Sequence, residues 1–210
     1  SLVRSYLACV SFVDDQVGKV LDALERSDKT QNTYVVLYSD HGFHLGEKEK
    51  WAKRSLWKNS TKVPLIISGP GIPKGETCDL PVQLLDIYPT LLELSGLASD
   101  PIHQGNSLIP ILKKGASEWP YMARTSIGPG NYSIVSKNYR FIQYNDNTAE
   151  LYDRINDPNE WYNLINNPDL SDVIREHRNK IPNQRHKILG QGSLGHESYS
   201  FSEKGVFMEN

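Results

Sequence analysis

A short apolar segment that ends in charged residues constrains the fold of this chain more than any other feature. Residues 34–38 have the length and composition of a buried strand, and Asp40 and His41 follow directly. At the carboxyl ends of parallel strands, side chains face the crevice in which open α/β sheets bind ligands. The segment therefore predicts a parallel sheet in which Asp40 and His41 reach a substrate or a metal ion.

The segments around this strand have the periodicities of one helix and one further strand. Apolar residues between Tyr6 and Leu24 recur at steps of three and four, which predicts an amphipathic helix. A second strand is predicted over residues 63–68, so that two strands bracket the polar loop. This order is typical of a parallel α/β sheet that is covered by helices.

A further helix is predicted after the second strand. Asp86 is a suitable N-cap, and Pro89 is tolerated in the first turn because its missing N–H group has no partner to lose there. Ser95 and Gly96 then end this helix.

Beyond about residue 115 the pattern changes to short strand candidates separated by turn residues. It predicts an antiparallel meander over residues 132–136, 139–144 and 150–152. A last helix is predicted from Ser171 to about Lys180 and is stopped by Pro182.

These segments group into three expected parts. Residues 1–114 belong to an α/β domain, and residues 115–182 form a small C-terminal subdomain of antiparallel strands with one helix. Residues 183–210 are a polar tail that we expect to be weakly structured or wrapped over the surface.

Composition and charge exclude several kinds of partner. The net charge of −2, with Lys and Arg residues scattered along the chain, leaves no electrostatic footprint for nucleic acid. Because no run of about 18 apolar residues occurs, we predict neither a membrane partner nor a signal peptide within this piece. Cys9 and Cys78 lack the spacing of a metal site, and we expect two free and mostly buried thiols.

Several motifs, in the same order along the chain, resemble those of type I, formylglycine-dependent sulfatases. The closest likeness is to the iduronate-2-sulfatase-like and choline-sulfatase-like branches. The matching segments are Ser-Asp-His-Gly at 39–42, His-Leu-Gly-Glu at 44–47, Trp-x-Lys at 51–53, the strand and turn at 63–71, the helix region at 78–97, the linker at 105–112, and a closing signature from Glu-Leu-Tyr-Asp at 150–153 to Asn-Leu at 163–164. The resemblance implies an alkaline-phosphatase/sulfatase-like α/β sandwich, of which residues 1–114 are the C-terminal part of the catalytic domain.

Two parts of the family pattern do not occur in this chain. Neither Cys9 nor Cys78 lies in the Cys/Ser-x-Pro/Ala-x-Arg motif that such sulfatases convert to formylglycine, and the family's N-terminal pair of metal-binding aspartates is absent. We therefore interpret the chain as the C-terminal half of a sulfatase. The resemblance implies that the formylglycine nucleophile and further metal ligands belong to an N-terminal half, which is then a partner of this one.

The resemblance assigns a metal to the polar loop. Asp40 supplies a hard carboxylate oxygen suited to calcium, with magnesium the less favoured ion, and it matches a metal-binding aspartate of the family. The alternative is an N-cap or turn residue. His41 is expected to be a metal ligand or a catalytic donor on the sulfate side, although imidazole is softer than the oxygen donors that calcium prefers. Its alternative is a purely structural histidine.

Two further residues are candidates for contact with the substrate. Lys53 matches the family's active-site lysine, which binds substrate and neutralises the sulfate oxygens and the leaving alkoxide as the S–O bond breaks. The alternative is a solvated surface lysine. His44 is expected to contact substrate, or else to be a satisfied loop histidine. Glu47 and Trp51 are interpreted as architecture, the former holding the loop by hydrogen bonds and the latter packing it against the core.

The remaining basic residues near the loop, Lys48, Lys50, Arg54 and Lys58, are expected to be solvated.

The leading interpretation of the chain is a sulfuric ester hydrolase that acts on a sulfated small molecule or carbohydrate. A phosphatase or phosphomutase of the wider alkaline phosphatase superfamily is the alternative enzyme. A non-catalytic scaffold or substrate-binding half is the alternative outside the enzymes. The family implies a periplasmic or secreted protein, or a lysosomal one in a eukaryote. The sequence is compatible with an oligomer and does not decide the oligomeric state.

Overall fold

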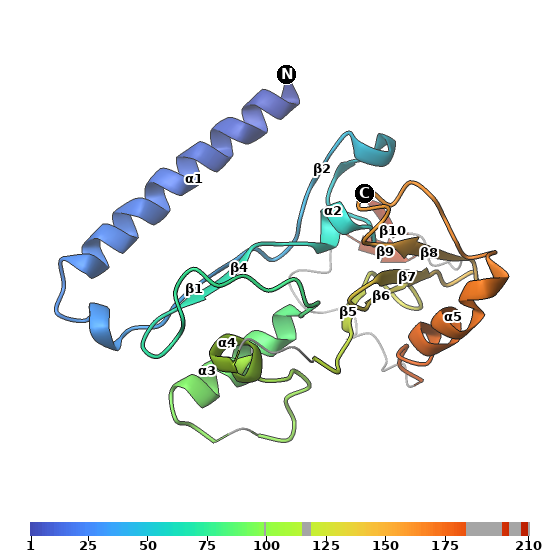
Figure 1. The fold of residues 1–210 in the computed structure, drawn as a ribbon. Coiled ribbons are helices and arrows are strands. Elements are labelled where there is room, and N and C mark those ends of the chain that lie inside the picture. The colour runs from blue at the N-terminus through green and yellow to red at the C-terminus, as the bar shows by residue number, and fades with distance from the viewer. Residues whose placement is uncertain (99, 115–118, 184–198, 202–206, 210) are drawn as a thin grey trace. The chain divides into compact units, whose positions relative to one another are not determined.

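A computed structural model describes residues 1–210 except 99, 115–118, 184–198, 202–206 and 210 (Figure 1). The chain divides into two compact units. The first unit consists of Ser1–Arg54, Asn59–Cys78 and Leu84–Trp119, and the second of Ser55–Lys58, Asp79–Gln83 and Pro120–Asn210.

The first unit begins with the predicted amphipathic helix, α1 (Leu2–Glu25). None of its residues is buried, and the ring of Tyr6 contacts that of Phe43 at a centroid distance of 5.2 Å. Cys9 lies on this helix and Cys78 in a loop, and both are free and exposed. The expectation of buried thiols is therefore wrong, because neither element places its cysteine against a packed core.

A short 3-10 helix, η1 (Thr30–Asn32), leads into β1 (Val35–Tyr38), which pairs with β4 (Leu65–Ser68). The pair is antiparallel, so the expected parallel arrangement of these two strands is wrong. A parallel return needs a long crossover, usually a helix. The connection instead contains only β2 (His44–Leu45), η2 (Glu47–Glu49), β3 (Trp51–Ala52) and the single turn α2 (Lys58–Thr61).

The second predicted helix is α3 (Ile87–Leu94), which follows η3 (Leu84–Asp86). Pro89 lies in its first turn as predicted, and Gly96 follows its end with φ +68°. Asp86 occupies the N-cap position but makes no side-chain cap bond. Its buried carboxylate instead accepts the N–H of Asn106 at 2.8 Å, which ties the start of α3 to the segment before α4 (Ile109–Lys114).

The second unit contains the predicted antiparallel meander. The sheet has the order β5-β6-β7-β8, and its strands are β5 (Ala123–Ser126), β6 (Tyr132–Val135), β7 (Tyr139–Gln143) and β8 (Ala149–Asp153). The edge strand β5 was missed because its sequence, Ala-Arg-Thr-Ser, lacks the alternation of apolar residues that marks the other three.

Strand alternation gives this sheet two different faces. Ile134, Phe141 and Leu151 lie opposite one another on one face and are fully buried. The last helix, α5 (Ser171–Arg178), packs on this face through Val173 and Ile174, as Figure 1 shows for the position of the helix beside the sheet. The predicted C-terminal helix is thus present. The other face carries Arg140, Ile142, Glu150 and Tyr152, so it combines polar with apolar groups.

The closing signature at residues 150–164 has a local structural explanation. The carboxylate of Asp153 accepts two backbone N–H groups of the following turn, and that of Asp157 accepts the N–H of Tyr162 at 2.8 Å. The side-chain oxygen of Asn163 accepts the N–H of Leu151 at 3.0 Å. These bonds fold the chain after β8 back along that strand.

η4 (Pro168–Leu170) precedes α5, and its N-cap Asn167 accepts the N–H of Asp169 at 3.0 Å. In the tail, β9 (Tyr199–Phe201) and β10 (Phe207–Glu209) form an antiparallel pair, and the remainder of residues 184–210 lies outside the described residues. Among the helices that the structure describes, none is long and apolar enough to cross a membrane.

The buried face of the sheet gives a first prediction. Replacing Ile134, which is 0% exposed, by Ala should lower the free energy of unfolding by about 2–5 kcal/mol, because a packed side chain is lost and a cavity remains. Ile155, which is 63% exposed, is the matched control, and Ile155→Ala should change stability by less than about 0.5 kcal/mol. Urea unfolding measures both values, and equal losses would contradict the assignment of the core.

The buried imidazole of His177 gives a second prediction. Its Nδ1 donates to the carbonyl of Val173 at 2.7 Å, and its Nε2 accepts from the hydroxyl of Ser136 at 3.0 Å. Burial lowers the pKa of His177 below its ordinary value of 6.5. The folded state then binds fewer protons than the unfolded state below about pH 6.5, so stability is full above that pH and falls as the pH drops towards the lowered pKa.

Melting temperatures measured from about pH 7.5 to about pH 5 should therefore fall less steeply for His177→Gln than for the parent protein, even if the variant is less stable at neutral pH. Identical slopes for the two proteins would mean that His177 does not contribute to the loss of stability in acid.

Candidate active site

The Ser-Asp-His-Gly turn begins directly after β1. The hydroxyl of Ser39 donates to the carbonyl of His41 at 2.8 Å, and the N–H of Gly42 donates to the carbonyl of Ser60 at 2.8 Å. A Cβ atom at position 42 would lie 2.0 Å from the carbonyl oxygen of Asn59. Only glycine allows this approach, and the turn is held against the chain at residues 59–60 as a result.

Hydrogen bonding fixes the orientation of the His41 ring. Its Nδ1 lies 2.8 Å from the carbonyl oxygen of Gly42, to which it donates. In the neutral ring this assignment leaves an unshared electron pair on Nε2. The Nε2 atom lies 2.9 Å from Nζ of Lys53 and 3.7 Å from a carboxylate oxygen of Asp40. The structure thus brings Asp40, His41 and Lys53 together at one point.

A small hairpin carries Lys53 to this point. β2 and β3 pair antiparallel, with His44 opposite Ala52, and Lys53 follows β3 directly. Lys48, Glu49 and Ala52 have φ values of 54°, 57° and 69°, in the left-handed region that side chains disfavour. Backbone of this kind persists where the surrounding structure determines it, and it is concentrated at functional sites.

Glu47 holds this hairpin as predicted. Its carboxylate accepts the N–H of Leu45 at 2.6 Å, and this bond is the main cause of its lowered pKa, with a smaller contribution from Asn59. Trp51 behaves differently from the expectation. It is 46% exposed, so it does not pack the loop against the core, and its ring instead lies over Gly46, where a Cβ atom would stand 3.5 Å from it.

His44 is the least accessible of the candidate residues. Its side chain is 1% exposed, and Nδ1 lies 3.3 Å from the carbonyl oxygen of Glu47. This burial favours the alternative of a loop histidine that is satisfied by its surroundings. Its contact with substrate stays a prediction.

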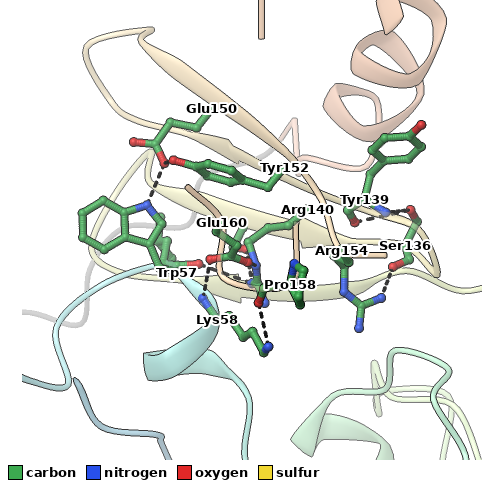
Figure 2. Close-up of polar contacts among 12 residues, drawn as sticks. Trp57, Lys58, Ser136, Tyr139, Arg140, Glu150, Tyr152, Arg154, Pro158 and Glu160 are labelled. Carbon is green, nitrogen blue, oxygen red and sulfur yellow. Dashed lines mark hydrogen bonds and ion pairs between the residues drawn. The ribbon is translucent and has the colours of Figure 1, made fainter. Parts of the chain in front are cut away.

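Lys53 and Asp40 are exposed, as a site for an incoming ligand requires. Lys58, which was expected to be solvated, is half-buried, and its Nζ donates to the carbonyl of Pro158 at 2.7 Å in a bond that is exposed (Figure 2).

The chemistry of Asp40 and His41 fits part of a metal site. Asp40 offers carboxylate oxygens, its side chain is 81% exposed, and His41 offers the unshared pair on Nε2. Calcium requires about 6–8 ligands, and the residues that the structure describes contain no group of three His, Cys, Asp or Glu side chains that could hold a metal ion. The two residues therefore offer two candidate ligands, which is fewer than a calcium ion requires.

Comparison with known proteins agrees with the resemblance seen in the sequence motifs. The family model described as Sulfatase matches residues 1–97. A protein from Formosa agariphila named Sulfatase is 49% identical over 166 residues, which cover 79% of this chain and 33% of the relative. A choline-sulfatase from Rhizobium meliloti is 33% identical over 172 residues, again 79% of this chain and 33% of the relative. The chain spans about a third of the length of these curated relatives.

A solved structure of a protein in complex with its substrate, D-glucosamine-2-N,6-O-disulfate, superimposes with a TM-score of 0.71 at 29% identity. The match covers 83% of this chain and 38% of the other. This likeness confirms the predicted α/β fold class.

Proposed function

The chain belongs to the sulfatase family, and we propose that it supplies the lysine and two metal ligands of an enzyme that hydrolyses a sulfate ester. The family is the one that the sequence motifs predict. The observation that carries the proposal is the convergence of three groups, because Nε2 of His41 lies 2.9 Å from Nζ of Lys53 and 3.7 Å from the carboxylate of Asp40.

The ammonium group of Lys53 suits the demands of this reaction. Hydrolysis breaks the bond between sulfur and the alcohol oxygen, so negative charge grows on the leaving alkoxide while the sulfate oxygens remain charged. A fixed ammonium group lowers the energy of that transition state most where solvent is excluded by the bound substrate. Lys53 is accessible to such a substrate, and the His41 ring orients it.

Asp40 and His41 would hold a divalent cation, calcium in preference to magnesium, together with ligands from outside this chain. Such an ion supplies further positive charge to the sulfate oxygens. The unshared pair on Nε2 of His41 can serve either a cation or the Lys53 ammonium, but not both at once. Nε2 of His41 therefore accepts a hydrogen bond from Lys53 in the absence of substrate, and the Lys53 side chain can leave it to contact a bound substrate.

The nucleophile is proposed to be a formylglycine in a part of the protein that precedes this chain. No Cys/Ser-x-Pro/Ala-x-Arg motif occurs among the 210 residues, so neither Cys9 nor Cys78 is a candidate for conversion to formylglycine. If the complete protein contains no such motif, this chain is instead a non-catalytic scaffold or substrate-binding half.

A sulfated carbohydrate is the proposed substrate class. The superimposed structure was solved with a disulfated glucosamine, and a curated relative from Bacteroides thetaiotaomicron is named N-acetylglucosamine-6-O-sulfatase. Choline sulfate is the alternative that the relative from Rhizobium meliloti suggests. A phosphate ester is the less favoured alternative, because the Trp-x-Lys and Glu-Leu-Tyr-Asp motifs are those of sulfatases. A periplasmic or secreted location is proposed on the basis of the family.

The role of Lys53 predicts a specific loss of activity. Lys53→Ala in the complete protein should lower turnover by roughly 10²–10³-fold while leaving the melting temperature unchanged, because one stabilising charge is removed from the transition state. Lys50→Ala, in the same loop, is the control and should have little effect. Sulfate release from sulfated sugars and an aryl sulfate measures both, and equal losses at the two positions would refute the assignment.

The role of Asp40 predicts a loss of metal. Asp40→Ala should reduce bound calcium and turnover together, because a charged oxygen ligand is removed. Asp28→Ala, which alters an exposed carboxylate away from the turn, is the control. Elemental analysis and sulfate release would be measured on the same preparation. Full calcium occupancy with unchanged turnover in Asp40→Ala would exclude Asp40 as a ligand.

A further inference from the structure

Two separate segments of the first unit carry the candidate residues. Asp40 and His41 lie in the turn after β1, whereas Lys53 follows the β2–β3 hairpin. Nε2 of His41 lies 2.9 Å from Nζ of Lys53, so the relative position of the two segments determines whether these groups meet. The contacts that hold the hairpin against the turn are therefore part of the construction of the site.

The hairpin has too little internal structure to fix its own position. β2 and β3 pair through two residues on each strand, and an isolated two-stranded hairpin is marginally stable in water. Lys48, Glu49 and Ala52 have left-handed φ values, which cost free energy and persist only where the surrounding structure imposes them. Contacts from outside the hairpin are therefore needed to place Lys53.

Asn59 contacts both segments. Its side chain donates a hydrogen bond to the carboxylate of Glu47, which also accepts the N–H of Leu45 at 2.6 Å. Its backbone carbonyl oxygen lies against Gly42, where a Cβ atom would stand 2.0 Å away. The carbonyl of the next residue, Ser60, accepts the N–H of Gly42 at 2.8 Å. Asn59 thus meets the hairpin with its side chain and the Ser-Asp-His-Gly turn with its backbone.

The charge of Glu47 strengthens this connection. Hydrogen bonds from the backbone N–H of Leu45 and, to a smaller extent, from the side chain of Asn59 lower the pKa of Glu47, so its carboxylate is ionised at neutral pH. Hydrogen bonds to an ionised acceptor are stronger than those between neutral groups. The carboxylate therefore joins β2, through Leu45, to a residue whose backbone is packed against the turn.

We propose that Asn59 is a positioning residue for Lys53, because it fixes the hairpin that carries this lysine against the turn that carries His41. This inference rests on the role of Lys53 in the proposed function. Asn59 does not touch substrate and acts through Glu47. All of these residues belong to the first unit.

A double-mutant cycle on the complete protein tests the inference, with sulfate release from D-glucosamine-2-N,6-O-disulfate and 4-nitrophenyl sulfate as the assay. Asn59→Leu keeps the approximate size of the side chain and removes the donor to Glu47. We expect it to lower kcat by ~10–100-fold, because misplacing a catalytic group by about 1 Å can cost on the order of 10²-fold. In a Lys53→Ala background the same substitution should lower kcat by less than about threefold, since there is no lysine left to misplace. Losses that add in full would overturn the proposal.

Two further variants separate positioning from general stability. Asn32, which is exposed in η1 of the same unit, is the matched control, and Asn32→Leu should lower kcat by less than about twofold. A loss as large as that of Asn59→Leu would overturn the proposal. Glu47→Gln weakens the acceptor of the same bond, so its loss should not add to that of Asn59→Leu. If Asn59→Leu does not fold, Glu47→Gln takes its place in the cycle with Lys53→Ala.

Hydrogen exchange gives a readout that does not depend on activity. In Asn59→Leu the amide of Leu45 should exchange faster, because its acceptor Glu47 loses its bond outside the hairpin, whereas the amide of Gly42 should keep its rate, because the carbonyl of Ser60 still accepts it. Unchanged exchange at Leu45, or equal acceleration at both amides, would overturn the proposal. If the complete protein released no sulfate from either ester, the proposed function would fail, and the exchange rates would still decide whether Asn59 holds the hairpin.

Discussion

The buried ion pair of Arg140 and Glu160 constrains how the polar face of the β5–β8 sheet is covered (Figure 2). Two charges removed from water are tolerable only when their remaining hydrogen-bonding groups are satisfied, and here Ser133, Leu56 and Lys58 provide the partners. Removing one member of such a pair typically costs about 3–5 kcal/mol, because the other charge is left buried alone. Residues 56 and 58 thus satisfy the buried charges, and Leu56 in turn covers part of this face by packing with Ile142 and Tyr152.

The two faces of this sheet are held by different kinds of interaction. Ile134, Phe141 and Leu151 close the apolar face under α5 by packing, which depends little on direction. The polar face uses directional bonds to the consecutive residues 56–58. In the first unit, close packing at Gly42 and the carboxylate of Glu47 play the corresponding part, since they set the turn and the hairpin from which Asp40, His41 and Lys53 converge.

Features set by local pattern were predictable from the sequence, and features set by distant contacts were not. The long first helix, the meander and the last helix follow from periodicity and turn residues. The antiparallel pairing of β1 with β4 depends on the path of the intervening chain, which periodicity does not describe. The motifs identified Asp40, His41 and Lys53 as candidates. They did not reveal the bonds of Lys58 to residues about 100 positions away.

Asp40, His41 and Lys53 are proposed to form one face of a sulfate ester site. A crystal structure of the complete protein with calcium and inorganic sulfate bound tests it most directly. We expect the cation within bonding distance of a carboxylate oxygen of Asp40 and of Nε2 of His41, with the ammonium of Lys53 turned from the ring to a sulfate oxygen. A cation and sulfate bound at another place, with Lys53 directed into solvent, would contradict it.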